Sequence, residues 1–426
     1  MRDRQVFEET RLSNGICTFH YKDQSPLCFI KVLFPVGSAH SCGMFPPGMF
    51  HFLEHMVMRR HPNSRDLDQL VGLKGGDFRA KTTMFHTIYS LEVPAKHFQE
   101  VLPKFFSFLF EEPPLPEEAI RSERGIISSE RRSRERWFPG DEEIEQYLRT
   151  QWMCDFALSL RQQLGSEDDL DLIDAQQLRN AYQSYFHPSI LVLAGGSVEP
   201  NPLFSRLETL KTHQTHLKNS YQRTSWANRE YREHAFRDAS RYVLNYGSIM
   251  KPCPELNVVF AIDFIMEYLT NGVHGPIYSW LREERGWVYE VTWNSAIDDH
   301  DPSLETDSEA AYEWHLFLPL ANKNQVKETR KEFPERVKKA LKNTSAIQRE
   351  VERRLSIVEA YWYNQLKYIV EGAERSISTF GKIVAEAEYK KAFEACRNPA
   401  FLQQVWDLSF KEENIGSICT IPFKET

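Results

Sequence analysis

Two histidines, four residues apart in an otherwise apolar segment, constrain the fold of this chain more than any other feature. They belong to the motif HFLEH at residues 51–55, and the apolar spacing over 49–59 predicts a helix. On a helix, His51 and His55 share one face about one turn apart, a spacing that suits two nitrogen ligands of a tetrahedral zinc ion. Glu54 lies on the flank of that face, so it can reach a metal-associated water without being a ligand. This order of residues is the inverted zinc motif H-x-x-E-H.

A solvated surface helix is the alternative interpretation of this segment, and its histidines and glutamate would then bind nothing. The composition of the segment argues against that alternative. Nearly all of its other residues are apolar: Met49, Phe50, Phe52, Leu53, Met56, Val57 and Met58. We therefore expect a largely buried helix with one polar face.

A catalytic zinc ion usually takes three protein ligands, so the third must come from another segment. The segment after Pro116 predicts a helix to about Arg136, and it carries Glu123 and Glu130. These glutamates are seven residues apart, close to two helical turns, so they share a face. One could bind the metal while the other orients a histidine, or the helix could simply be charged and exposed. Spacing alone leaves both possibilities open.

Composition excludes several classes of protein. A chain of 426 residues with 41% apolar and 26% charged residues is a globular protein of two or more domains. Its net charge of −8 argues against nucleic acid as the main partner. No run of about 18 apolar residues is present, so we expect no membrane span. The N-terminus lacks the apolar core of a signal peptide.

The cysteines predict neither a disulfide framework nor a cysteine zinc site. Their number is odd, their spacings are wide, and no C-x-x-C motif occurs. They are Cys17, Cys28, Cys42, Cys154, Cys253, Cys396 and Cys419. Buried, reduced thiols in a reducing compartment are the simplest interpretation, so we expect a cytoplasmic protein.

Periodicity and turn residues predict an α+β fold, with strands and helices mixed in each half of the chain. In the first half we expect strands at 16–20, 27–36, 77–82, 86–93 and 189–198, and helices at 49–59, 64–75, 96–110, 117–136 and before 187. The stretch 312–319 echoes 87–94, and a charged helix follows each at a similar distance. We therefore predict two similar domains, 1–212 and 238–426, joined by a polar linker over 213–237.

The sequence resembles the pitrilysin-like, or insulinase-like, zinc peptidases. Besides the zinc motif, the segments that carry the resemblance are Gly37-Ser38-Ala39, Gly75-Gly76 with Ala80 and Thr82, and Tyr185-Phe186-His187-Pro188. The family has two glutamates seven residues apart on a helix after the motif, and the second is the metal ligand. The resemblance therefore implies one zinc ion per chain, held by His51, His55 and Glu130. It also implies that Glu54 is the catalytic base and that Glu123 supports the ligands.

The resemblance extends to the second half of the chain. The segment 281–289 resembles an arginine and tyrosine element that holds substrate and stabilises an oxyanion, which implies these roles for Arg282 and Tyr289. Chains of this size in the family have two α/β-sandwich domains. They pair as homodimers or heterodimers, so that four domains enclose a clam-like chamber. The expected substrate is then an unfolded or precursor peptide.

One departure from the family lies beside the zinc motif. The family favours Asn-Ala on the strand thought to align the substrate backbone, and this chain has Arg79-Ala80, followed by Thr82. Substrate preference is therefore open. Relatives can also be non-catalytic or partner-dependent subunits that only bind peptides. The intact motif favours a peptidase over that alternative.

Overall fold

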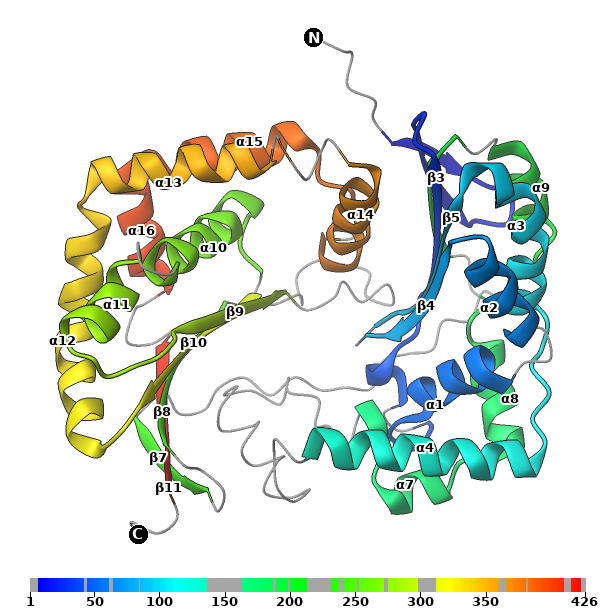
Figure 1. Ribbon diagram of the computed structural model, residues 1–426, viewed down its shortest axis with the longest axis horizontal. Helices are drawn as coiled ribbons and strands as arrows, with labels where there is room; N and C mark the ends of the chain where they lie inside the picture. The colour runs from blue at the N-terminus through cyan, green and yellow to red at the C-terminus, as the bar shows by residue number, and fades with distance from the viewer. Residues whose placement is uncertain are drawn as a thin grey trace.

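The computed structural model describes most of the chain in sixteen segments. They are residues 7–41, 44–60, 64–83, 85–135, 163–186, 189–197, 200–212, 231–236, 241–250, 253–271, 275–297, 312–358, 360, 365–380, 382–409 and 415–422. These residues form two β-sheets, each packed with helices around its own hydrophobic core (Figure 1). The α+β prediction is confirmed. We call each sheet with the helices on its core the first and the second domain. The predicted linker, 213–237, lies largely outside the described residues.

The first sheet has six strands in the order β1-β2-β6-β3-β5-β4. The strands are β1 (Glu8–Arg11), β2 (Cys17–Lys22), β3 (Leu27–Phe34), β4 (Asp77–Thr82), β5 (Thr87–Pro94) and β6 (Leu191–Gly196). Neighbouring strands are antiparallel except for β2 and β6, which are parallel. All but β1 were predicted. Of the described strands, β4 pairs only with β5, so it forms an edge of this sheet.

Helices of the first domain cover one face of its sheet. They are α1 (Met49–His55), a π-helical turn η2 (Met56–Arg60), α2 (Ser64–Leu73), α3 (Ala95–Phe110), α4 (Glu117–Glu135), α7 (Glu167–Asp171), α8 (Ala175–Gln183) and α9 (Pro200–Glu208), with a short 3-10 turn η1 (Ser38–Ser41). In α3, the residues that predicted a buried face are all buried: Phe98, Val101, Leu102, Phe105 and Phe108. Burying each such side chain contributes about 1.5–3 kcal/mol.

The second sheet repeats the topology of the first. Its order is β7-β11-β8-β10-β9, and the strands are β7 (Arg232–Phe236), β8 (Tyr242–Met250), β9 (Thr292–Ile297), β10 (Tyr312–Leu320) and β11 (Ile415–Pro422). β7 and β11 are parallel and the other pairs antiparallel, as in β2-β6-β3-β5-β4. The weak sequence echo between 87–94 and 312–319 therefore reflects equivalent strands, β5 and β10.

Helices of the second domain also follow the order of the first. They are α10 (Leu256–Thr270), α11 (Pro276–Tyr278) with the π-helical turn η4 (Ser279–Glu284), α12 (Lys323–Leu341), α13 (Thr344–Ile357), α15 (Glu386–Ala395) and α16 (Pro399–Ser409). By their place between equivalent strands, α10 corresponds to α1, α12 to α3, and α13 to α4. The second domain is thus built on the same plan, and its strand β7 comes from within the segment predicted as a linker.

One helix from the second half of the chain packs on the first sheet. α14 (Leu366–Phe380) lies against β3 and β6, on the face opposite to α3, and stands between the two domains in Figure 1. Its Ala373 and Ile377 join Leu33, Ile88 and Leu193 in a small buried cluster. The sequence did not predict this contact.

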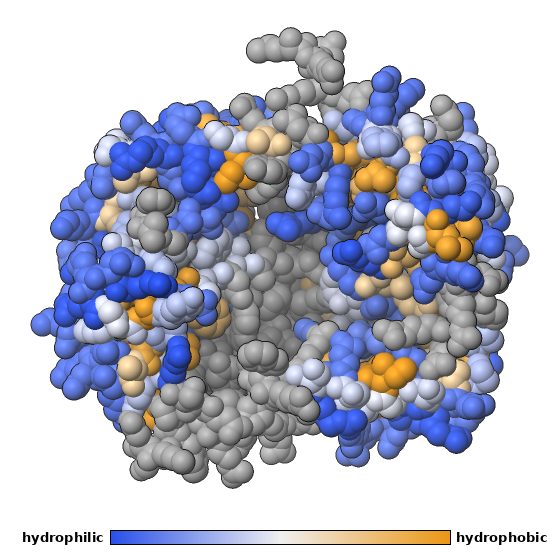
Figure 2. Space-filling model, viewed as in Figure 1, coloured by the Kyte–Doolittle hydropathy of each residue, from blue (hydrophilic) through white to orange (hydrophobic). Residues whose placement is uncertain are grey.

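The molecular face in Figure 2 is mostly hydrophilic, with small hydrophobic patches over both domains. Among the described residues, no helix combines the length and the hydrophobicity that crossing a membrane requires.

A glycine fixes the start of α1. Gly48 has φ +83°, in the left-handed region, and a Cβ at this position would lie 2.6 Å from backbone atoms of Leu164 and Gly165. A side chain would therefore strain its own backbone and also push away the neighbouring segment.

We predict that Gly48→Ala destabilises the protein more than Gly75→Ala. Gly75 has φ +73° but no atom within 4 Å of a Cβ, so its substitution costs only the left-handed strain of about 1–2 kcal/mol. Gly48→Ala adds the backbone clash to the same strain. Thermal unfolding of both variants measures the difference. Equal losses of melting temperature would show that the close approach at Gly48 is unimportant.

Candidate active site

The predicted ligands converge in the first domain. The Nε2 atom of His51 lies 3.2 Å from Oε2 of Glu130, and Nε2 of His55 lies 3.5 Å from the same oxygen. One potential ligand atom from each of the three residues lies within 4.8 Å of the others. α1 supplies the two histidines and α4 supplies the glutamate. The predicted pairing of these helices is therefore present.

A second carboxylate orients one of the histidines. Oε1 of Glu123 lies 2.9 Å from Nδ1 of His55, and the Glu123 side chain is fully buried. A bond at Nδ1 leaves Nε2 of this ring facing Glu130, because the two nitrogens point to opposite sides of the imidazole. Glu123 thus contacts His55 at Nδ1, while Glu130 lies beside Nε2 of both histidines.

Glu54 lies beside the cluster on the same helix. Its Oε2 atom accepts a hydrogen bond of 2.7 Å from the Thr82 hydroxyl and lies 3.7 Å from Nδ1 of His51. The hydroxyl of Thr82 also approaches the carbonyl oxygen of Phe50, at 3.4 Å. Thr82 is the last residue of β4. Its hydrogen bond therefore joins this strand directly to the buried carboxylate of Glu54 on α1.

The carboxylates raise the pKa of both histidines. Burial lowers the pKa of His55, but its contacts with Glu123 and Glu130 outweigh burial and raise the pKa to about 9. For His51, burial also lowers the pKa, and the contacts with Glu130 and Glu54 outweigh it. The carboxylates thus favour positive charge here, and protons compete with a metal cation for the same nitrogens.

Two arginines hold α4 in place from its other side. Arg124 donates hydrogen bonds to the carbonyl oxygens of Leu170 (2.9 Å) and Ile173 (3.0 Å). The buried Arg131 donates to the carbonyl oxygen of Gly165. Each arginine directly follows one of the two site glutamates in the sequence. Anchoring α4 to the segment before α8 therefore fixes where both carboxylates lie.

The strand expected to align substrate lies at the edge of the sheet next to this cluster. Arg79 is 73% exposed, and its Nε lies 2.5 Å from the carboxylate of Asp77 on the same strand face. Ala80 is half-buried and packs against the core of the domain. The structure thus places Arg79, Ala80 and Thr82 along one edge strand, and Thr82 also contacts Glu54.

Arg282 and Tyr289 lie in the second domain, apart from the histidines. The Arg282 guanidinium stacks on the Tyr289 ring at 4.7 Å and on the Tyr278 ring at 5.4 Å, and it donates to the carbonyl oxygen of Tyr289. Tyr289 is 71% exposed. The two residues therefore form one local unit, which follows α11 on the opposite side of Figure 1 from α1.

Ion pairs occupy the equivalent position of the second domain. Glu267 on α10 lies 3.2 Å from Arg353 and 3.0 Å from Arg354, both on α13. Glu350, also on α13, lies 2.5 Å from Arg353. Guanidinium groups thus balance the carboxylates between α10 and α13, where the first domain has imidazoles between α1 and α4.

Sequence reasoning missed three contributions to the site. Thr82 was predicted only as a substrate contact, because its partner Glu54 is distant in sequence. Arg124 and Arg131 were assigned no role from the sequence. Their seven-residue spacing, identical to that of the glutamates before them, was the one available signal.

The donor set fits a zinc ion. Zinc takes imidazole nitrogen and carboxylate oxygen at about 2.0–2.2 Å in a tetrahedron, which places neighbouring ligand atoms about 3.3 Å apart. The separations of 3.2 and 3.5 Å between the two Nε2 atoms and Glu130 Oε2 agree with this value. His55 also has the buried carboxylate partner that metal-bound histidines commonly have.

Comparison with solved structures gives similar folds. A protease from Helicobacter pylori has a TM-score of 0.77 at 17% identity, over 98% of this chain and 100% of that one. The periplasmic protease PqqL from Escherichia coli has a TM-score of 0.69 at 13% identity, over 98% of this chain and 48% of that one. At these identities the likeness shows the fold alone.

Sequence relatives are similar over short stretches of the chain. Human nardilysin is 33% identical over 87 residues, which are 20% of this chain and 8% of nardilysin. Protease 3 of Escherichia coli (strain K12) is 26% identical over 136 residues, which are 30% of this chain and 14% of that protein. The matches therefore cover only a small part of each relative's length.

Family models match more than half of the chain. Residues 18–153 match the model described as Insulinase (Peptidase family M16), and residues 172–304 match the one described as Peptidase M16 inactive domain. The first of these segments contains the whole His51, His55 and Glu130 cluster. The chain belongs to the M16, or insulinase, family of zinc metallopeptidases.

Proposed function

We propose that this chain is a zinc-dependent endopeptidase that hydrolyses unfolded peptides, or one precursor peptide, in a chamber formed by two subunits. One observation carries the proposal: His51, His55 and Glu130 converge beside the carboxylate of Glu54. The three converging residues would hold one zinc ion per chain. Glu123 would keep His55 in the ligating orientation.

The chain's own residues supply the proton transfers. A bound zinc ion provides Lewis acidity, which polarises a carbonyl group and lowers the pKa of water toward about 7. Glu54 is not among the ligand atoms, so its carboxylate is available to take a proton from the attacking water and return it to the leaving amine. The hydrogen bond from Thr82 fixes the carboxylate for both transfers.

The substrate would lie along β4 as an added strand. Among the strands that the structure describes, β4 pairs with β5 alone, so its other edge can accept an extended peptide. Arg79, Ala80 and Thr82 would then contact the peptide. Arg79 adds an exposed guanidinium beside the substrate path, where the family has a neutral asparagine.

Arg282 and Tyr289 would come from the partner subunit. Within one chain they lie in the other domain, and their stacked pair is exposed. In a dimer, this pair could face the zinc site of the neighbouring chain and stabilise the oxyanion and the peptide carbonyls. Either a homodimer or a heterodimer with a related subunit would provide this arrangement. Nucleic acid and membrane are not proposed as partners.

A partner-dependent or peptide-binding subunit is the second candidate function. The separation of the Arg282–Tyr289 pair from the histidines favours it, because a chain lacking the right partner would then be inactive.

Five described cysteines form no disulfide with one another, in keeping with a reducing compartment, and we propose the cytoplasm. Cys42 and Cys154 lie outside the described residues.

Replacing the base should separate metal binding from turnover. We predict that Glu54→Gln retains zinc as the wild type does but lowers peptide turnover by at least about a hundredfold, because it removes the general base. Metal analysis and cleavage of a peptide library measure the two effects. Chelator should abolish wild-type cleavage, and added zinc should restore it. Normal cleavage by Glu54→Gln would refute the assigned role.

The two glutamates of α4 should differ in their effect on zinc affinity. Glu130→Gln should lose zinc on dialysis, because it removes a ligand. Glu123→Gln should weaken zinc binding by about 10- to 100-fold, because it frees the His55 ring. The exposed Glu118→Gln on the same helix is the matched control and should bind zinc normally. Unchanged affinity in Glu123→Gln would contradict the orienting role.

Mixing two inactive variants tests the shared active site. We predict that Glu54→Gln and Tyr289→Phe are each nearly inactive as homodimers. After the subunits exchange, half of the dimers are mixed, and each contains one complete site. Activity should therefore recover to about a quarter of the wild-type value. No recovery, with mixed dimers demonstrated by mass spectrometry, would mean that each chain uses its own tyrosine, and an active Tyr289→Phe homodimer would mean that the tyrosine has no role.

A further inference from the structure

α14 docks closely on the first sheet although it comes from the second half of the chain. Its Leu366 and Val370 pack on Phe29 of β3 in a small buried cluster. At Gly195 of β6, an added Cβ would lie 2.8 Å from Val370 and 3.0 Å from Leu366. Side chains of the helix therefore occupy the space that a side chain at Gly195 would need.

A buried carboxylate at the centre of this contact joins α14 to two strands. Glu374 is 6% exposed and contacts the ammonium groups of Lys31 on β3 and Lys81 on β4, the latter at 2.5 Å. Burial raises the pKa of Glu374, but the two lysines outweigh burial and hold the pKa below its usual value. The carboxylate therefore stays ionised at neutral pH, and both ion pairs persist.

Lys81 and Thr82 face opposite sides of β4, because successive side chains of a strand alternate. Thr82 points to the Glu54 carboxylate, and Lys81 points to α14. As an edge strand, β4 has only β5 as a neighbour within its sheet. The ion pair between Glu374 and Lys81 gives β4 a second contact, with α14, at the residue next to Thr82.

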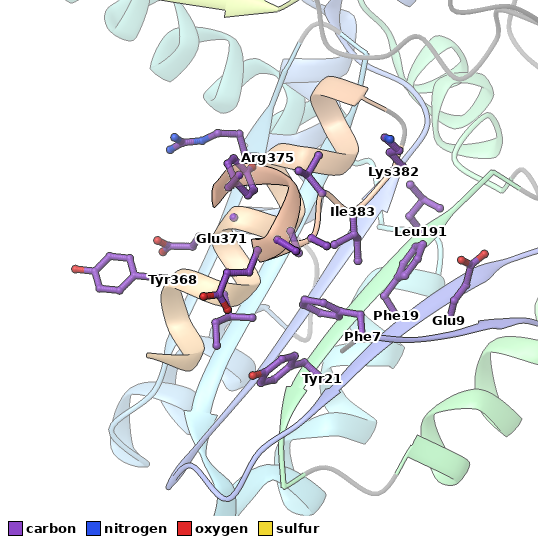
Figure 3. A pocket seen from close by; sticks show the side chains of 18 of the residues that line it. Phe7, Glu9, Phe19, Tyr21, Leu191, Tyr368, Glu371, Arg375, Lys382 and Ile383 are labelled. Atoms are coloured by element: carbon purple, nitrogen blue, oxygen red, sulfur yellow. The ribbon is translucent and has the colours of Figure 1, made fainter. Parts of the chain in front are cut away.

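Elsewhere α14 leaves space between itself and the sheet. A cavity of about 750 Å³ separates part of the helix from β1 and β2. Figure 3 shows Phe7, Phe19 and Tyr21 on the strand side of this cavity, while Tyr368 and Glu371 extend from α14. The docking of α14 thus depends on its contacts with β3, β5 and β6 and on its ion pairs. Lys367 of α14 pairs with Glu92 of β5 at 3.5 Å, and Glu374 pairs with the two lysines.

We propose that α14 positions the edge strand β4 through the Glu374–Lys81 ion pair, and that β4 in turn holds Thr82 against Glu54. Lys81 and Glu374 are positioning residues. They do not contact substrate, but they hold β4 in place and through it the Glu54 carboxylate. This inference rests on the proposed function, because it concerns the same site. It makes peptidase efficiency depend on a contact between distant parts of one chain.

Substituting the two lysines separately tests the proposal. Lys81→Met breaks the contact with β4, whereas the matched control Lys31→Met breaks an ion pair to the same carboxylate but leaves β4 supported. With zinc bound, Lys81→Met should raise KM and lower kcat/KM by about tenfold, while Lys31→Met should stay within about twofold. Lys81→Arg keeps the ion pair and should restore wild-type values. Loss of folded protein alone would lower kcat and leave KM unchanged.

Hydrogen exchange of residues 77–82 in the full chain gives a second readout that needs no activity. Exchange in this segment should be about threefold to tenfold faster in Lys81→Met than in Lys31→Met or the wild type. Equal exchange in Lys81→Met and Lys31→Met would overturn the proposal. Faster exchange in Lys81→Met together with an unchanged KM would also overturn it. If the zinc-loaded wild type cleaves no peptide, the proposed function fails, while the exchange comparison still decides whether the ion pair holds β4.

Discussion

The contact between the His55 imidazole and the buried carboxylate of Glu123 is the interaction on which the rest of the site depends. A fully buried carboxylate is costly unless it is paired, so this contact fixes the relative position of α1 and α4. It also sets the orientation of the ring, and Nε2 then meets Glu130 together with Nε2 of His51. Arg124 and Arg131 hold α4 in that position through hydrogen bonds to backbone carbonyl oxygens. The geometry of the metal-binding cluster follows from how two helices pack.

The two domains use one topology for different purposes. Both sheets have the order seen in β2-β6-β3-β5-β4, and in each a corresponding helix contacts the edge strand, α1 on β4 and α10 on β9. Between α1 and α4 the buried charges are carboxylates and imidazoles, a set that suits a cation. Between α10 and α13, Arg353 and Arg354 already balance Glu267. Guanidinium groups therefore supply the positive charge beside the carboxylate in the second domain, where the first domain has imidazoles.

The sequence predicted most of the first domain because local signals and burial agree there. The apolar spacing of α3, the glycines that end α2 and the proline that begins α4 all appear in the structure at the expected places. His51, Glu54 and His55 were recognisable from one helix face. For the third ligand, the family resemblance was needed to choose Glu130 over Glu123. The docking of α14 was not predictable, because its apolar face would suit any apolar surface. The bond from Thr82 to Glu54 joins residues on different elements, so no local pattern reveals it.

X-ray absorption at the zinc edge of the purified, zinc-loaded chain tests the central claim most directly. Ligation by two imidazoles and a carboxylate predicts a first shell of nitrogen and oxygen alone, at about 2.0–2.2 Å, with the outer-shell scattering of two histidine rings. A sulfur shell at about 2.3 Å, or a spectrum lacking histidine scattering, would contradict the account.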